Sequence, residues 1–277
     1  MNTGWQHVLV SWDPVAFSIG FFTIRWYGVC FLLGVAAVWF WLRFFQQRDG
    51  WLESQETLEQ VFVTVLVGAL LGARLGYVFV YAPAYFWQYP WAILSPWDPL
   101  TGQYTGLSGL SFHGALLGAS VALCVWARIQ KLPLLLWADR ISVVLPLGIF
   151  FGRLGNFLNG ELWGRPTDVR WGVYFPHADV LLRHPSPLYE AGGEGLGLFL
   201  VMLWLRRYIP EGSGQRAGSF LVGYGSTRFL LEFFREPDQG IGYLTCGFTL
   251  GQLLSLGLVV LAVLWLIWRR QRENMVY

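Results

Sequence analysis

The sequence predicts an all-α, polytopic integral membrane protein with about seven transmembrane helices and a small segment on the outer face. First, 55% of its 277 residues are hydrophobic and only 13% are charged, whereas an average soluble domain is about 25% charged. Second, the chain has 33 Gly and 16 Trp. Glycine is more frequent in membrane helices than in soluble ones, and tryptophan gathers at membrane interfaces. Third, long apolar stretches recur along the whole chain.

Seven of these stretches approach the length of roughly 20 residues that a spanning helix needs. The fifth is the weakest, because Glu190 and Glu194 fall in its first turns. We expect residues 1–277 to form a single transmembrane domain, with residues 152–188 as the outer segment. The predicted spans are residues 19–42, 58–81, 112–127, 134–151, 189–205, 219–234 and 248–268.

Basic residues predict the sidedness of the spans, because short cytoplasmic loops are enriched in Lys and Arg. The outer loop 82–111 contains neither residue type. This asymmetry favours an odd number of spans, an outer N-terminus and a cytoplasmic C-terminus. The outer segment from Arg153 to Arg183 departs from the pattern with four arginines, which predicts that it binds something anionic. The inner segments hold Arg43, Arg48, Arg128, Lys131, Arg206, Arg207, Arg216, Arg269, Arg270 and Arg272.

The cysteines argue against a cysteine nucleophile and a metal site, and the first residues argue against a removable signal peptide. Cys30, Cys124 and Cys246 lie far apart and lack metal-binding spacing. Cys30 and Cys124 lie in apolar runs, so we expect buried, inert thiols and neither a cysteine nucleophile nor a metal site. The start of the chain lacks the basic stretch, short apolar run and cleavage site of a removable signal peptide. The net charge of +2 predicts no polyanionic partner such as nucleic acid.

Small residues spaced four apart predict close helix packing, because such faces let membrane helices approach one another. We find no convincing internal repeat, so an inverted-repeat transporter gains no support. The glycines concerned are Gly68, Gly72 and Gly76, then Gly114 and Gly118, and finally Gly148 and Gly152.

Polar and ionisable groups gather in the predicted outer halves of the spans or at the outer surface. Such groups are costly inside a membrane and usually mark a site or a pathway. They predict a shared cavity that faces outward. The alternative is that each group separately pairs or snorkels to the interface. The set comprises Arg25, Tyr27, Arg74, Tyr77, Tyr81, His113, Arg153, Asn156, Tyr189, Glu190, Arg228, Glu232 and Arg235.

The sixth span carries the clearest polar stripe. Tyr224, Arg228, Glu232 and Arg235 are spaced i, i+4, i+8 and i+11, so they share one helix face. One interpretation is an acid–base and anion-binding stripe that faces the cavity. The other is an Arg228–Glu232 ion pair that holds helices together, and spacing does not separate the two.

The stretch GRLGNFLNGELWG, residues 152–164, follows the fourth apolar run. Arg153 and Asn156 are three residues apart and share a face. Irregular backbone at membrane depth is tolerated only inside protein or beside a wet cavity, and a guanidinium is suited to holding phosphate. The alternative is a helix C-cap followed by an ordinary polar loop. Four glycines predict that the helix loosens or ends here: Gly152, Gly155, Gly160 and Gly164.

Several motifs in the same order resemble the prolipoprotein diacylglyceryl transferases of bacteria. The resemblance covers nearly the whole chain, and its fourth-span motif is highly specific. The motifs are DPVAFSIG (13–20), RWYG (25–28), GARLGYVFVY (72–81), SFHGALLG (111–118), GRLGNFLNGELWGR (152–165), RHPSPLYE (183–190) and GYGSTRFLLEFFREPD (223–238).

The chain departs from the family pattern at three places. Ala115 stands where the family usually repeats a glycine, and Pro187 stands where glutamine is expected. The outer segment 165–183 is also short. These differences bear on substrate detail more than on activity.

The resemblance implies a single catalytic domain in the bacterial plasma (inner) membrane, with its active site toward the outer leaflet. Such an enzyme moves the sn-1,2-diacylglyceryl group from phosphatidylglycerol to the lipobox cysteine thiol of a prolipoprotein signal peptide. Glycerol 1-phosphate leaves, in the first step of lipoprotein maturation. The implied partners are phosphatidylglycerol, the prolipoprotein and membrane lipid, without nucleic acid, metal or organic cofactor.

The resemblance also implies roles for individual residues. Arg153 would hold the lipid head group with help from Asn156. Arg228 would contact the phosphate, and Glu232 would orient it. The expected lipid-binding set is Arg153, Asn156, Gly164, Tyr224, Arg235 and Glu161, although Glu161 could instead only cap the loop that follows.

The transfer needs a thiolate, since the thiol is the weaker nucleophile. His113 is the candidate general base, because an imidazole ordinarily titrates near neutral pH. Its alternative role is a hydrogen bond to phosphate or backbone. Tyr27 and Tyr224 are possible second donors. The expected catalytic set is therefore His113, Arg228, Glu232 and Tyr27.

Two other classes of function remain open at this stage. A transporter or channel with an outward-facing anion cavity would favour a polar path that continues to the cytoplasmic side, and we find no comparable polar cluster in the inner halves. A different lipid head-group or acyl transferase is the second alternative. Metal-dependent phosphatidyl transfer should show paired aspartates, which this sequence lacks.

Overall fold

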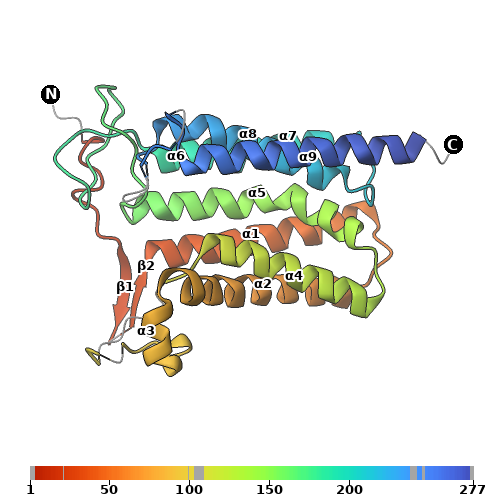
Figure 1. Ribbon diagram of the computed structural model, residues 1–277, viewed down its shortest axis with the longest axis horizontal. Coiled ribbons are helices and arrows are strands. Elements are labelled where there is room, and N and C mark those ends of the chain that lie inside the picture. The colour runs from red at the N-terminus through yellow and green to blue at the C-terminus, as the bar shows by residue number, and fades with distance from the viewer. Residues whose placement is uncertain are drawn as a thin grey trace. The chain divides into compact units, whose positions relative to one another are not determined.

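The structure is a computed structural model that describes residues 4–20, 22–98, 100–102, 109–237, 242–244 and 247–274. It is mostly helical (Figure 1). The chain divides into two compact units. The first unit comprises Met1–Ile19, Thr23–Phe44 and Leu135–Tyr277, and the second comprises Gly20–Phe22 and Phe45–Leu134. Five helical stretches are long and apolar enough to cross a membrane: Trp26–Asp49, Gln55–Tyr81, Leu134–Leu158, Ser186–Leu205 and Leu250–Arg272. The chain is therefore a multi-pass helical protein.

The first unit contains most of the long helices. Helix α1 (Trp26–Asp49) belongs to it up to Phe44, and α5 (Leu134–Leu158) from Leu135 onward. Helices α6 (Ser186–Glu190) and α7 (Leu198–Leu205) are joined by the π-helical turn η3 (Ala191–Gly197). Helix α8 (Gln215–Leu231) ends in the 3₁₀ turn η4 (Glu232–Phe234) and lies beside α9 (Leu250–Asn274) (Figure 1).

The predicted first span, 19–42, begins too early. Strands β1 (Val15–Ile19) and β2 (Phe22–Arg25) form a two-stranded hairpin, and the helix begins only at Trp26. Gly20 has a φ of +61°, which a glycine adopts at no steric cost in a tight turn. Val15–Ile19 and Phe22–Arg25 therefore belong to strands, and the all-α prediction is corrected to a mostly helical fold with one hairpin.

The predicted end of the fourth span is also wrong. Helix α5 runs through Gly152 and Gly155 to Leu158, so the outer segment starts after residue 158 and not at 152. A Cβ at Gly155 would lie only 3.0 Å from Tyr27 Cδ2. This glycine therefore serves close packing against α1 and does not break the helix. The chain turns at Gly160, whose φ is +67°.

The fifth and sixth predicted spans are subdivided in the structure. Span 189–205 corresponds to α6, η3 and α7, and it begins three residues earlier, at Ser186. Span 219–234 corresponds to α8 and η4, so its polar stripe continues past the end of the regular helix. Glu232 lies in the 3₁₀ turn and Arg235 is extended.

The second unit is built on α2 (Gln55–Gly76) and α4 (Phe112–Gln130), which pack side by side (orange and yellow-green in Figure 1). The close packing predicted for the glycines of these two helices is confirmed, whereas a Cβ at Gly152 of α5 would meet nothing within 4 Å. A Cβ at Gly72 would lie 2.3 Å from the carbonyl oxygen of Gly114, and one at Gly68 would lie 2.8 Å from that of Gly118. Between the two helices come the π turn η1 (Tyr77–Tyr81), α3 (Pro83–Gln88) and the 3₁₀ turn η2 (Pro90–Ile93).

Gly72→Ala should destabilise the second unit, because the new methyl group would meet backbone atoms that cannot rotate away. Over-packing of this kind typically costs about 1–3 kcal/mol. Thermal unfolding in detergent should show a lowered midpoint. Gly257→Ala in α9 is the matched control, since its Cβ would meet nothing within 4 Å. Equal midpoints for the two variants would contradict the packing role.

The outer segment is fastened to the end of η4 by backbone hydrogen bonds. Arg165 N–H donates to the Phe234 carbonyl at 2.9 Å, and Glu236 N–H donates to the Trp163 carbonyl at 3.3 Å. Leu9, Phe157, Val173 and Phe175 form a small buried core that includes residues of this segment. The partly buried residues packed against it are Val8, Leu158, Trp163, Ala178 and Leu188. The segment therefore fixes where the chain leaves α8.

Two of the four arginines in the predicted anion-binding stretch hold this segment together. Arg183 pairs with Asp179 at 2.7 Å and with Glu236 at 3.1 Å, and its hydrogen bonds lower the pKa of the Asp179 carboxyl. Arg165 donates to the Arg235 carbonyl at 2.9 Å. Two of the four arginines in residues 153–183 therefore make structural contacts within the protein, and they are not evidence for a ligand site.

Candidate functional site

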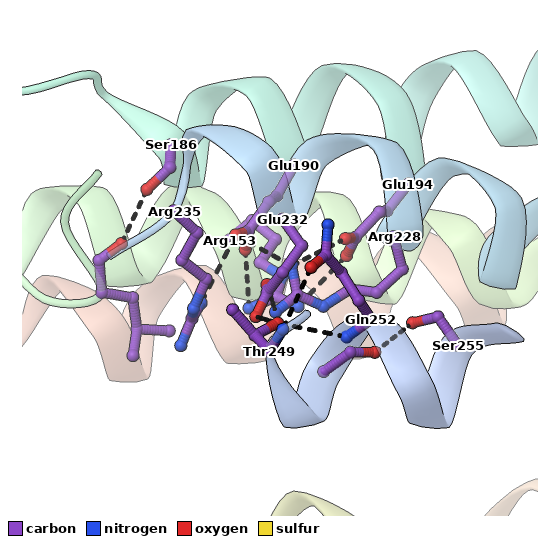
Figure 2. Close-up of polar contacts among 12 residues, drawn as sticks. Arg153, Ser186, Glu190, Glu194, Arg228, Glu232, Arg235, Thr249, Gln252 and Ser255 are labelled. Atoms are coloured by element: carbon purple, nitrogen blue, oxygen red, sulfur yellow. Dashed lines mark hydrogen bonds and ion pairs between the residues drawn. The ribbon is translucent and has the colours of Figure 1, made fainter. Parts of the chain in front are cut away.

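Three arginines and three glutamates meet inside the first unit, and we call them the ion cluster (Figure 2). They come from three separate parts of the chain. Helix α5 supplies one arginine, α6 and η3 supply two glutamates, and α8 with the residues after it supplies the rest. The members are Arg153, Glu190, Glu194, Arg228, Glu232 and Arg235.

Glu190 is the hub of the ion cluster. Its Oε2 lies 2.8 Å from Arg153 Nη1. Its Oε1 lies 3.3 Å from Arg228 Nη1 and 3.3 Å from Arg235 Nη1. One carboxylate therefore contacts all three guanidinium groups, and its side chain is 0% exposed.

Glu194 makes a second link between two of these arginines. Its Oε2 accepts a hydrogen bond from Arg153 Nη2 at 3.1 Å, and its Oε1 lies 3.7 Å from Arg228 Nη1. Arg153 is thus held by two different carboxylates through its two terminal nitrogens. The guanidinium planes of Arg153 and Arg228 are fixed by the same pair of glutamates, which is a pre-organised arrangement.

Glu232 is bound differently from the other two glutamates. One oxygen pairs with Arg228 Nη2, and the other accepts a hydrogen bond from Thr249 Oγ1 at 2.9 Å. Thr249 directly precedes α9. Glu232 therefore ties the end of α8 to the start of α9.

The charges of the ion cluster balance, with three guanidinium groups against three carboxylates. The arginine side chains are 16%, 14% and 11% exposed, and the glutamate side chains are 0%, 0% and 7% exposed. An uncompensated charge at such burial would be strongly destabilising. The pairing explains how six ionisable groups are accommodated within one helical unit.

Local sequence explains how the two glutamates come to share a face. Glu190 and Glu194 are four residues apart across the junction of α6 and η3. π-helical turns are rare and are often found at functional sites. Gly195 lets η3 approach α5 closely, because a Cβ there would lie 2.6 Å from Phe150 Cα.

A second polar group lies at the end of α5. Asn156 Nδ2 and Asn159 Nδ2 donate to the two carboxylate oxygens of Glu161, at 3.3 Å and 3.0 Å. Tyr27 of α1 lies within electrostatic reach of both Glu161 and Arg153. The structure therefore brings together Asn156, Glu161 and Tyr27 at the edge of the ion cluster.

The remaining predicted residues of the first unit are also placed at this site. Tyr224 lies within electrostatic reach of Glu194 and Arg153, and its ring stacks on Phe220. Gly164 is buried and pairs with Arg235 in an isolated β-bridge. A Cβ at Gly164 would lie 2.6 Å from the Phe234 carbonyl oxygen, so this glycine positions the backbone that carries Arg235.

His113 and Arg74 belong to the second unit. His113 lies in the first turn of α4 with an exposed side chain, and its role as a base stays a prediction. Arg74 is buried and donates to the carbonyls of Ile93, Ala92 and Gly109 at 2.8, 2.7 and 3.3 Å. These bonds give Arg74 a structural role in the connection before α4.

Sequence reasoning missed three residues of the site: Glu194, Thr249 and Gln252. Glu194 was treated only as a weakness of the fifth span. Its i, i+4 spacing from Glu190 in an apolar stretch was the available signal. Thr249 and Gln252 form a T-x-x-Q capping pattern, which indicates a helix start but no chemistry.

The cysteines and carboxylates suggest no other chemistry at this site. Cys30 is buried as predicted, whereas Cys124 is half-buried, and Cys246 lies outside the described residues. Within the described ranges, no group of three or more His, Cys, Asp or Glu side chains is arranged to hold a metal ion. The arrangement is instead suited to a phosphate ester, because a guanidinium offers five N–H donors in a fixed plane and binds phosphate oxygens in pairs.

Comparison with known proteins gives one consistent result. A family model described as "Prolipoprotein diacylglyceryl transferase" matches residues 14–268. A phosphatidylglycerol–prolipoprotein diacylglyceryl transferase of Nitrosomonas europaea is 44% identical over 93% of this chain and 90% of its own. The protein of that name from Cupriavidus metallidurans is 42% identical over 95% and 96%, and that from Pseudoalteromonas atlantica is 44% identical over 95% and 91%. The chain belongs to the prolipoprotein diacylglyceryl transferase family.

Proposed function

We propose that this chain transfers the sn-1,2-diacylglyceryl group of phosphatidylglycerol to the lipobox cysteine thiol of prolipoproteins. The relatives carry both substrates in their names. The observation that supports the proposal most directly is the joint fixation of Arg153 and Arg228 by Glu190 and Glu194. Two guanidinium groups held in one place are suited to an anionic phospholipid.

The proposed reaction is an alkyl transfer to sulfur. The cysteine thiolate attacks the glyceryl carbon that bears the phosphate, so an S–C bond forms and a C–O bond breaks. The thiol proton passes to a base, and glycerol 1-phosphate leaves with one more negative charge than the phosphodiester had. Arg153, with Asn156 beside it, would hold the head group. Arg228 would stabilise the charge that develops on the leaving phosphate, because pre-organised donors act where charge appears.

The other site residues have supporting roles in this proposal. Tyr27 and Tyr224 would donate to the lipid, Glu161 would orient Asn156, and Gly164 would keep Arg235 in place. No cofactor or metal takes part in the steps assigned to these residues.

The proposed topology has seven spans with an outer N-terminus and a cytoplasmic C-terminus. Helices α4 and α8 would be the two spans in addition to the five stretches already described. The distribution of Lys and Arg supports this orientation. In this orientation the ion cluster would lie toward the outer leaflet of the plasma membrane.

A transporter or channel is the chief competing function. In the predicted inner halves, the described residues include a smaller polar group, in which Arg140 pairs at 3.1 Å with Glu211, whose side chain is 34% exposed, near the start of α5. The neighbouring Asp139 accepts hydrogen bonds from the backbone of Gly214 and Ala217, both at 2.9 Å. These bonds cap the start of α8, so the inner cluster has a structural explanation and does not favour an ion path.

The decisive test is a mass measurement. Purified protein incubated with phosphatidylglycerol and a lipobox peptide should raise the peptide mass by one diacylglyceryl group. An unchanged peptide with an altered lipid head group would instead support a different lipid transferase. An unchanged peptide and unchanged lipid would refute enzymatic transfer under these conditions and favour a transport function.

His113→Gln should slow transfer at every pH between about 6 and 9, because a glutamine side chain cannot act as the general base that takes the thiol proton. The kcat of the purified variant should be measured across that range with the same peptide. His177→Gln, in the outer segment, is the matched control. Full activity of His113→Gln at every pH would remove His113 from the mechanism.

A further inference from the structure

Helix α9 begins with a capping box next to the ion cluster. Thr249 N–H donates to Gln252 Oε1 at 3.0 Å, and Gln252 N–H donates to Thr249 Oγ1 at 3.2 Å. This reciprocal pair satisfies donors that a helix start otherwise leaves open. The start of this 25-residue helix also carries a partial positive charge, which favours anions.

The first turn of α9 already holds an anion, namely the carboxylate of Glu232. Thr249 Oγ1 donates to Glu232 Oε1 at 2.9 Å. Gly251 makes room for it, because a Cβ at that position would lie only 2.6 Å from the same oxygen. The other Glu232 oxygen pairs with Arg228. A hydroxyl, a guanidinium and a helix start therefore converge on one oxyanion.

Gln252 contributes a donor with no use in this arrangement. Its side chain is 1% exposed, and its Nε2 has no hydrogen-bond partner among the described residues. The amide oxygen is committed to Thr249 N–H, and Figure 2 shows the amide directed from α9 toward the ion cluster. A buried, unpaired amide donor is costly, so its presence points to a partner that arrives with a ligand.

Glu232 is the carboxylate that the cluster can release at the lowest cost. Glu190 contacts three arginines and Glu194 contacts two. Glu232 pairs with Arg228 alone within the described residues, and it lies in the 3₁₀ turn where the chain leaves α8. Because the cluster is already neutral, an incoming phosphate adds an uncompensated negative charge unless a carboxylate withdraws.

We propose that Glu232 is a resident anion whose place at Arg228 and the α9 turn is taken by the phosphate of the lipid substrate. Thr249 Oγ1 and Gln252 Nε2 then donate to phosphate oxygens together with Arg228. The exchange keeps the buried charge balanced and gives the unpaired amide its partner. This inference rests on the proposed function and replaces the orienting role that the resemblance implies for Glu232.

The test is the affinity of the purified full-length protein for sn-glycerol 1-phosphate, the leaving product, measured by calorimetry in detergent. Glu232→Gln keeps the shape of the side chain and removes the competing charge, so the Kd should fall about tenfold, equivalent to about 1.4 kcal/mol. An orienting role predicts the opposite, a raised Kd. A raised or unchanged Kd for a folded Glu232→Gln protein would overturn the proposal.

Gln252→Met provides the second arm, since it removes the amide donor without adding charge. Its Kd for glycerol 1-phosphate should rise about tenfold. A role in capping alone would lower the unfolding midpoint and leave the Kd unchanged, and that result overturns the proposal even where Glu232→Gln fails to fold. Ser255→Ala is the control, because its hydroxyl donates at 2.7 Å to the Gly251 carbonyl within α9. Transfer to the lipobox peptide is measured separately with the unchanged protein, so loss of the proposed function and loss of the exchange are distinguishable.

Discussion

Arg153→Ala and Arg228→Ala should each abolish lipidation while the protein still inserts into the membrane. Each guanidinium is held by Glu190 and Glu194 in a fixed place, and each would act on a phosphate whose charge grows during transfer. Removing one pre-organised donor of this kind typically costs about 10²–10³-fold in kcat. The measurement is the rate of diacylglyceryl transfer to a lipobox peptide by purified variants.

Arg170→Ala is the control for both variants. Arg170 lies in the outer segment with an exposed side chain, so its loss should leave the rate unchanged. Normal transfer by both purified Arg153→Ala and Arg228→Ala would refute the assignment of the two arginines.

Glu190→Ala should cause the largest loss of stability of any single change in the cluster. It leaves three buried guanidinium groups without the carboxylate that they share. Breaking a buried ion pair by removing one partner costs about 3–5 kcal/mol. Thermal unfolding in detergent should show a much lower midpoint, together with a low yield of folded protein.

Glu56→Ala is the matched control for this loss. Glu56 is exposed in the first turn of α2 and accepts a hydrogen bond from Gln60, so its replacement should change stability by less than about 0.5 kcal/mol. A Glu190→Ala protein as stable as Glu56→Ala would show that the three arginines do not depend on this carboxylate.

Helix placement could be predicted from the sequence wherever apolar length decided it. The helix predicted as the third span begins at residue 112 as expected, and the glycines of α2 and α4 lie in close helix packing as expected. The failures came from residues whose role depends on a neighbour. Gly155 was expected to end the helix, but it allows α5 to pack closely against Tyr27. Val15–Ile19 and Phe22–Arg25 form a hairpin, although residues from 19 onward were expected to be helical.

The ion cluster could be predicted only in part, because some of its contacts are local in sequence and others join different helices. Spacing alone placed Arg228 and Glu232 on one face, and the structure confirms that they pair. The spacing of Glu194 from Glu190 was a signal within its own segment, but its partners Arg153 and Arg228 could not be assigned because they lie on other helices. Gln252 gave only the signal of a helix start, since its capping role is local and its unpaired nitrogen is visible only in three dimensions.

The dispersed origin of the ion cluster has a consequence for biogenesis. The ribosome makes Arg153 before either glutamate that neutralises it, and Arg228 later still. A lone arginine at the centre of an inserted helix costs about 2.5–3.5 kcal/mol, and Arg153 carries a smaller cost because it lies near the end of α5. Nascent chains that stop before α6 would therefore carry this cost without the two carboxylates that pair with Arg153 in the folded protein.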